Sequence, residues 1–149
     1  MNTTESTALP ADVAYASKPT DRRRARSGRR WFVGMTVFYW LLLFTLTHIP
    51  GPNLPEVEVS DKTIHFVAYA LLAGMVLSSL HLLRPSSRIN EPLTLLIVLA
   101  YGAFDETTQP YFNRSGEVAD WLADAAGVAL AVGVVGLFWA WIKRPRTPM

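Results

Sequence analysis

Four long apolar segments constrain this chain more than any other feature of its sequence. They cover residues 31–49, 64–83, 93–112 and 118–142. At a rise of ~1.5 Å per residue, a helix needs ~20 residues to cross the hydrocarbon core of a bilayer, and each segment is close to that length. We therefore predict an all-α fold, a bundle of four transmembrane helices that occupies residues 31–142.

The number of basic residues alternates between the predicted connections. Of the fourteen Lys and Arg residues, seven precede the first span, one lies in the first connection, two in the second, one in the third, and three follow the last span. Lys and Arg accumulate on the cytoplasmic side of a membrane. The pattern therefore predicts that both termini and the second connection are cytoplasmic.

The two ends of the chain are polar. Residues 1–30 show no helical period of apolar residues, so we expect a disordered basic cytoplasmic tail there, and residues 143–149 form a second short tail. The formal net charge is +2, but the basic residues flank apolar spans, which membrane orientation explains better than nucleic-acid binding does. The absence of cysteine excludes disulfides and thiolate chemistry.

Small residues recur at four-residue spacing in the second and fourth predicted spans. One row is Ala70, Gly74 and Ser78, and the other is Ala125, Ala129 and Gly133. Small side chains let helix backbones approach closely in lipid. The two rows predict tight packing of these helices within one chain, with a dimer interface as the alternative, so the choice between monomer and homo-oligomer stays open.

Ionisable residues gather at the predicted outer ends of the spans. Asp61, His65 and Tyr69 are four residues apart and share a helix face, as do Asp105 and Gln109. The candidate ligand-binding residues at this end are Asp61, Lys62, His65, Tyr69, Asp105, Glu106, Gln109, Arg114, Asp120 and Asp124.

Three of these carboxylates, Asp105, Glu106 and Asp124, fall inside the predicted membrane region. Each buried charge costs ~2.5–3.5 kcal/mol on insertion scales, so such groups must be neutralised, paired or in contact with a wet cavity. Lys62 and Arg114 are the only basic residues on the outer side. We therefore expect these two cations to compensate the buried carboxylates.

The neighbours Asp105 and Glu106 point ~100° apart around a helix, so they cannot share one role. We expect Glu106 to face a polar pocket together with Gln109, three residues on, where His65 and Gln109 supply neutral hydrogen bonds. We expect Asp105 to pair with Lys62 or Arg114 instead.

Four motifs in order along the chain resemble the VanZ-like family of bacterial membrane proteins, over about residues 36–136. They are Asp61-Lys62-x-x-His65-Phe66-x-x-Tyr69, then Asp105-Glu106-x-x-Gln109, then Arg114 six residues before Asp120, and Asp124-x-x-Gly127. The chain departs from the family in two ways: it lacks a Pro-Gly pair between Gln109 and Arg114, and Asp124 stands where an asparagine is more usual.

The resemblance implies a multi-pass protein of the bacterial cytoplasmic (inner) membrane. The family takes its name from an accessory protein of glycopeptide resistance that is associated with reduced sensitivity to teicoplanin. The resemblance implies no defined activity, so the motif residues are candidate site residues to which it assigns no individual roles.

These features favour a non-enzymatic envelope protein with an outward-facing polar site. Its ligand would be small and polar or amphiphilic, such as a lipid head group, a wall precursor or a glycopeptide, with a role in glycopeptide resistance. Two alternatives stay open: a membrane-embedded hydrolase or transferase that uses the Asp/Glu/His cluster as acid and base, and a helix-packing subunit without a site.

Known enzyme motifs are missing from the sequence, including His-Glu-x-x-His, Gly-x-Ser-x-Gly and the Gly-rich phosphate loop. Histidines and carboxylates can bind zinc or a hard divalent cation, but no pair here has a recognised zinc spacing. We therefore predict no metal and no cofactor. The predicted partners are the lipid bilayer and the small ligand, with no nucleic acid.

Overall fold

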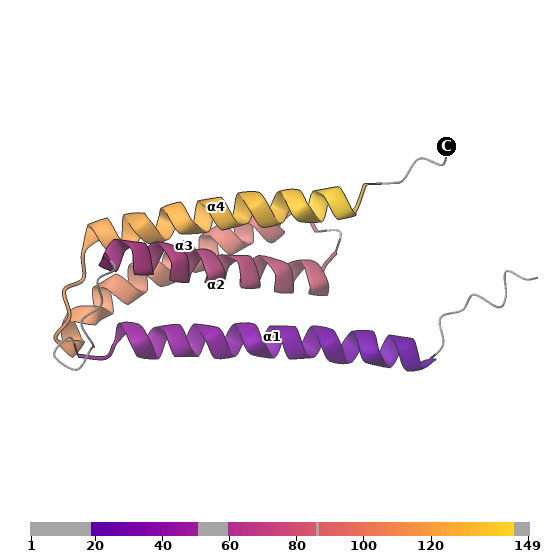
Figure 1. The fold of residues 1–149 in the computed structure, drawn as a ribbon, viewed down its shortest axis with the longest axis horizontal. Helices are drawn as coiled ribbons and strands as arrows, with labels where there is room; N and C mark the ends of the chain where they lie inside the picture. Colours follow the sequence, from indigo (N-terminus) through magenta and orange to yellow (C-terminus); the bar gives the residue numbers. More distant parts are fainter. Residues whose placement is uncertain (1–18, 51–59, 86, 145–149) are drawn as a thin grey trace, which may run out of the picture.

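The computed structural model describes residues 19–50, 60–85 and 87–144, and its described part is all-helical, as predicted. Four α-helices follow one another: α1 (Pro19–Thr47), α2 (Asp61–Leu83), α3 (Asn90–Thr108) and α4 (Val118–Ile142), with a 3₁₀ helix, η3 (Gln109–Phe112), between α3 and α4. Successive helices run in opposite directions (Figure 1). One end of the bundle therefore holds the end of α1, the start of α2, the end of α3 and the start of α4.

Three of the four helices are long and apolar enough to cross a membrane. The candidate spans are Arg26–Thr47, Asp61–Leu83 and Val118–Ile142. The third helix, α3, has 19 residues but carries three acidic side chains, Glu91, Asp105 and Glu106, and it is not among these candidates.

Helix α1 begins twelve residues before the predicted first span. The prediction of a disordered tail over residues 1–30 is wrong for residues 19–30, which are helical; residues 1–18 lie outside the described part. Arginine, which makes up half of this stretch, is a good helix former. Extending an existing helix adds a hydrogen bond per residue without a new nucleation cost, so the apolar span carries the helix into the basic segment.

The backbones of α2 and α4 approach each other very closely at Gly127. A Cβ atom added there would lie 2.2 Å from the carbonyl oxygen of Phe66 and 3.2 Å from the backbone nitrogen of Ala70. Only a glycine fits at this distance. Ala70 of the predicted α2 row does face α4, but Ala129 and Gly133 of the predicted α4 row are exposed, so the tight contact on α4 lies off that row.

Helix α1 is attached to the other helices by polar contacts as well as by aromatic ones. Thr36 Oγ1 lies 2.9 Å from Ser79 Oγ, and the Tyr39 hydroxyl donates to the carbonyl oxygen of Ala68 at 3.1 Å. Of the buried apolar side chains, α1 contributes only Leu43. Helix α1 therefore presents most of its apolar surface outward, as a helix that faces lipid does.

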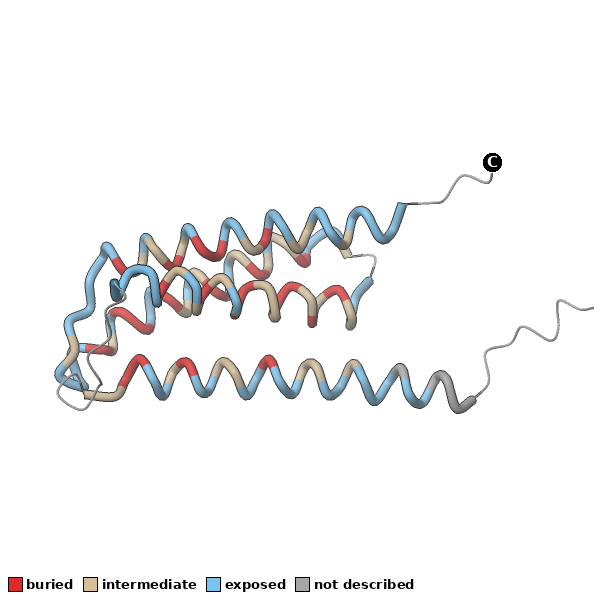
Figure 2. Tube along the Cα trace, in the orientation of Figure 1, coloured by how far each residue is buried: buried red, intermediate tan, exposed pale blue. Residues whose placement is uncertain are grey.

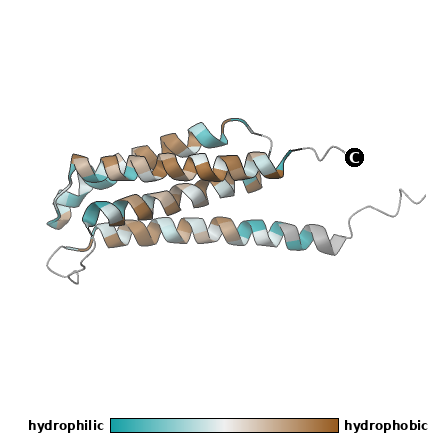
Figure 3. Cartoon of the chain, turned by 45° about the horizontal axis from the view of Figure 1, so that its top comes forward, coloured by the Kyte–Doolittle hydropathy of each residue, from teal (hydrophilic) through white to brown (hydrophobic). Residues whose placement is uncertain are grey.

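The buried core lies between α2, α3 and α4 (Figure 2). Its apolar members are Leu43, Tyr69, Leu72, Ala73, Val76, Leu77, Val98, Val128 and Val132. Hydrophobic colour dominates the middle of the helices, whereas hydrophilic residues gather toward their ends (Figure 3). At the end where α2 and α4 begin, these polar side chains turn inward.

Candidate functional site

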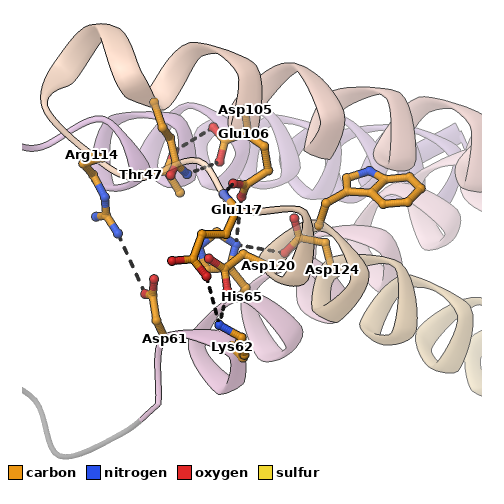
Figure 4. Close-up of polar contacts among 12 residues, drawn as sticks. Thr47, Asp61, Lys62, His65, Asp105, Glu106, Arg114, Glu117, Asp120 and Asp124 are labelled. Carbon is orange, nitrogen blue, oxygen red and sulfur yellow. Dashed lines mark hydrogen bonds and ion pairs between the residues drawn. The ribbon is translucent and has the colours of Figure 1, made fainter.

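The polar side chains at this end form two separate clusters (Figure 4). The Glu106 cluster consists of Lys62, His65, Glu106, Glu117, Asp120 and Asp124, from the start of α2, the end of α3, and the start of α4 with the residue before it. The Asp105 cluster consists of Thr47, His48, Asp105, Thr108 and Gln109, where the end of α1 meets the end of α3.

Three ionisable side chains from three helices meet at the centre of the Glu106 cluster. His65 Nδ1 donates to Asp124 Oδ1 at 3.0 Å, and the same nitrogen lies 3.6 Å from Glu106 Oε1. His65, Glu106 and Asp124 are only 4%, 9% and 1% exposed. A single imidazole thus lies between two carboxyl groups inside the protein.

Each of these two carboxyl groups has one oxygen with a partner and one without. Glu106 Oε2 accepts a hydrogen bond from the backbone N–H of Glu117 at 2.9 Å. Within the described residues, Glu106 Oε1 and Asp124 Oδ2 are buried and have no hydrogen-bond partner. A buried polar atom without a partner costs ~1–3 kcal/mol, so these two oxygens are strong acceptors for a donor group or a cation.

The connection between α3 and α4 positions Glu106. A Cβ atom added at Gly116 would lie 2.1 Å from the carbonyl oxygen of Glu106, so a glycine is needed where the chain passes the end of α3. This close passage puts the N–H of Glu117, the N-cap of α4, against the Glu106 carboxylate. The N-terminus of a helix favours a negative charge, which helps to hold Glu106 in place.

Lys62 and Arg114, the two cations expected to compensate the buried carboxylates, have different partners. Lys62 Nζ lies 3.3 Å from both Glu117 Oε2 and the buried Asp120 Oδ1. Arg114 Nη2 lies 3.8 Å from Asp61 Oδ1, on a side chain that is about half exposed. The expectation that Arg114 compensates buried carboxylates is wrong within the described residues, because Arg114 reaches across the end of the bundle to the start of α2.

Asp105 is fully buried and both of its oxygens have partners. Thr47 Oγ1 donates to Oδ1 at 2.8 Å, Gln109 Nε2 donates to Oδ2 at 3.2 Å, and His48 Nδ1 lies 3.6 Å from Oδ1. Asp105 was expected to pair with Lys62 or Arg114, and Gln109 to share a pocket with Glu106. Instead, the four-residue spacing of Asp105 and Gln109 joins those two side chains to each other.

Thr47 and His48 belong to this cluster although they are not among the candidate site residues from the sequence. Besides the contact of Thr47 with Asp105, His48 Nε2 lies 2.9 Å from Thr108 Oγ1. The sequence feature that could have pointed to both residues is their position as a polar pair at the end of an otherwise apolar span. Both carboxylate oxygens of Asp105 thus have partners within the Asp105 cluster, and the contacts of Thr47 and His48 attach the end of α1 to α3.

Tyr69 forms an aromatic wall beside the Glu106 cluster. Its ring stacks on His65 with centroids 6.1 Å apart, and on Tyr101 with centroids 5.8 Å apart. A Cβ atom at Gly102 would lie 3.3 Å from both the Tyr69 ring and Asp124 Oδ2, so this glycine leaves room where the wall and the carboxylate meet. Tyr69 is fully buried, and its ring lies nearly parallel to the imidazole ring of His65.

A further polar cluster lies at the opposite end of the bundle, and the sequence did not single it out. His81 Nε2 donates to Glu91 Oε1 at 3.0 Å, and His81 Nδ1 accepts from Asn90 Nδ2 at 3.1 Å and from Lys143 Nζ at 3.2 Å. Both nitrogens of His81 therefore have partners. The contacts of this cluster connect α2, α3 and the end of α4, so we interpret it as structural.

The two ends of the bundle thus differ in what they can do chemically. At the end where α2 and α4 begin, His65, Glu106 and Asp124 offer one ring nitrogen and two free carboxylate oxygens in a buried setting. Such a set can accept hydrogen bonds from a polar ligand or hold a cation, and the bond between Asp124 and His65 orients the imidazole. Of the ten predicted residues, this cluster brings together Lys62, His65, Glu106, Asp120 and Asp124.

Comparison with known proteins adds one finding. A model of the family described as VanZ/LLP1 matches residues 14–139, a stretch that includes all of α1, α2 and α3 and nearly all of α4. Comparison with the curated proteins gave no match, and neither did comparison with the solved structures.

Proposed function

The chain belongs to the VanZ/LLP1 family, as its four motifs predicted, and from this premise we propose that it binds a small polar or amphiphilic ligand at the outer end of a four-span bundle. The protein would lie in the bacterial cytoplasmic membrane with both termini in the cytoplasm. The Glu106 cluster would face outward and hold the polar part of the ligand.

The pair of unpartnered acceptors, Glu106 Oε1 and Asp124 Oδ2, supports this proposal most directly. A ligand with hydroxyl, amide or ammonium donors satisfies both oxygens, and hydrogen bonds to a charged group in a low-dielectric site are stronger than those in water. Lipid head groups, wall precursors and glycopeptides all carry such donors. The Asp105 cluster offers no comparable free acceptor, because both Asp105 oxygens already have partners.

The burial of its acidic residues supports a membrane crossing by α3 as well. Asp105 and Glu106 are 0% and 9% exposed, so both lie inside the protein, where intramembrane ionisable residues are found. A helix of 19 residues is ~28 Å long at ~1.5 Å per residue, which is close to the ~30 Å hydrocarbon core.

Single-cysteine labelling tests the crossing, and the chain has no native cysteine to interfere. Ser87→Cys and Ser115→Cys lie on opposite sides of α3. In intact cells we expect an impermeant thiol reagent to label the variant at position 115 but not the one at position 87. Equal labelling of both variants, or the reverse pattern, would contradict the four-span topology.

Native mass spectrometry of the detergent-purified protein tests ligand binding. We expect a retained amphiphile on the wild type and on Glu91→Gln, whose carboxylate is at the other end, and its loss from Glu106→Gln at an unchanged melting temperature. Glu106→Gln should also abolish any protection against teicoplanin in cells. If abundance and melting temperature fall together with the phenotype, the cluster serves helix packing and the proposal is wrong.

A further inference from the structure

We propose that His65, Glu106 and Asp124 together bind one divalent transition-metal ion, with Zn²⁺ as the best-suited ion. The inference rests on the proposed function in one respect, because the metal would hold the ligand at the same outer site. It departs from the sequence-based expectation of no metal. That expectation considered spacing along the chain, whereas these three side chains come from α2, α3 and α4.

The positions of the three ligand atoms suit a metal ion. The ring nitrogen and the two carboxylate oxygens all lie within 4.8 Å of one another. His65 Nδ1 is 3.0 Å from Asp124 Oδ1 and 3.6 Å from Glu106 Oε1. Ligands at ~2.0–2.2 Å from a tetrahedral Zn²⁺ are separated by about 3.3–3.5 Å, so small side-chain movements are enough.

The free acceptor on Glu106 is a second observation that points to a cation. Its Oε1 atom is buried, lies toward the imidazole of His65 and has no hydrogen-bond partner within the described residues. Its other oxygen is held by the N–H of Glu117. Such an outer hydrogen bond orients a metal-binding carboxylate and is typical of metal sites.

Charge balance also favours a divalent ion at this position. Two ionised carboxylates and a neutral imidazole carry a charge of −2, which a divalent cation neutralises, and buried charges must be compensated in this way. Lys62 is already engaged by Asp120 and Glu117, and Arg114 by Asp61. Neither cation has a described contact with Glu106 or Asp124.

The donor set selects the kind of metal. Imidazole suits zinc and other first-row transition ions, whereas Ca²⁺ and Mg²⁺ prefer oxygen ligands throughout. Three protein ligands leave a fourth position of a tetrahedral ion open. A hydroxyl oxygen of the ligand would occupy that position, in place of a direct hydrogen bond from the ligand to Glu106 Oε1.

An alternative trio, Asp61, His65 and Asp120, shares the imidazole but fits less well. Its two carboxylates already have cations, since Arg114 contacts Asp61 and Lys62 contacts Asp120. Asp61 is also exposed. Water and counter-ions therefore screen Asp61, and the trio of His65, Glu106 and Asp124 is the site we assign.

Zinc titration of the full-length protein in detergent, after removal of metal with EDTA, tests the assignment. We expect saturable binding of one Zn²⁺ per chain in competition with a chromophoric chelator. Glu106→Gln should weaken the affinity at least about tenfold, since even loss of an outer hydrogen bond to a ligand costs ~10–100-fold. Glu91→Gln is the matched control: it alters a His–Glu pair at 3.0 Å, and its affinity should equal that of the wild type.

X-ray absorption spectroscopy of the wild-type zinc complex tests the site without any substitution, so its result does not depend on whether Glu106→Gln folds. The spectrum should show one imidazole nitrogen among light-atom ligands. Absence of saturable binding, absence of imidazole, or equal affinity of the Glu106→Gln and Glu91→Gln proteins would overturn the assignment.

The two proposals can fail separately. If native mass spectrometry shows an amphiphile retained in EDTA by a protein that binds no Zn²⁺, the metal assignment is wrong and the ligand proposal stands. Saturable Zn²⁺ binding that Glu106→Gln weakens, without any retained amphiphile, supports the metal site and counts against the ligand proposal.

Discussion

The close contact between Gly127 and Phe66 predicts that a larger residue at position 127 would force α2 and α4 apart. A Cβ atom at position 127 would lie 2.2 Å from the Phe66 carbonyl oxygen, and real Cβ contacts are essentially never shorter than 3.0 Å. In Gly127→Ala, helices α2 and α4 must therefore move apart by at least the difference between these two distances, 0.8 Å. The obstacle is backbone, so no side-chain rotation relieves it.

The cost follows from overpacking, which typically destabilises a core by ~1–3 kcal/mol. In a chain of this size each kcal/mol lowers the melting temperature by roughly 2–4 °C. We therefore expect Gly127→Ala to melt at least about 2 °C below a Gly→Ala variant of the same helix that meets no such contact. If the same displacement of 0.8 Å is added to the 3.0 Å between His65 Nδ1 and Asp124 Oδ1, the two atoms lie farther apart than the about 3.3–3.5 Å that separates the ligands of a tetrahedral Zn²⁺, so zinc affinity should fall as well.

Gly133→Ala is the matched control, because it lies on the same helix and a Cβ atom there meets nothing within 4 Å. Both substitutions gain the same helix propensity, up to ~1 kcal/mol, so their difference isolates the contact with Phe66. Thermal unfolding in one detergent, followed by circular dichroism, measures it. If Gly127→Ala melts with or above Gly133→Ala, the close approach of α2 and α4 is not as described.

Two further predictions concern the polar end. Thr47→Val removes a hydrogen bond of 2.8 Å to the buried Asp105 and should cost ~1–3 kcal/mol. Thr45→Val, which loses only an exposed bond within α1, should leave the melting temperature nearly unchanged, and equal losses would refute the role of Thr47. Lys62→Met deprives a buried carboxylate of its cation, whereas Arg114→Met affects an exposed one. Lys62→Met should therefore melt lower in the same assay, and the opposite order would restore the sequence-based expectation for Arg114.

The fold class and the location of the candidate site followed from local properties of the sequence. Apolar segments of the right length predicted the helices, and the acidic residues between them marked one end as polar. The start of α1 was missed because hydropathy shows where a span must lie, not how far its helix continues. Residues 19–30 are polar, yet they form helix because they extend one that already exists.

The partners of individual side chains were harder to predict. The ~100° angle between Asp105 and Glu106 correctly required different surroundings for the two, but it did not give the partners. Asp105 contacts Thr47 of α1, and Glu106 contacts His65 of α2. These contacts depend on how α3 is rotated against its neighbours.

The helices, their polar end, the family and the residues from which a candidate site can be built all follow from the sequence alone. Tertiary packing is needed to show that His65, Glu106 and Asp124 meet, that Arg114 contacts Asp61, and that Gly127 rather than the row ending at Gly133 forms the tight contact. The reason is physical. Helices α2 and α4 are apolar on nearly every face, so no amphipathic period shows which face is buried. The rotation of each helix is set by the shape of the surfaces that pack against it.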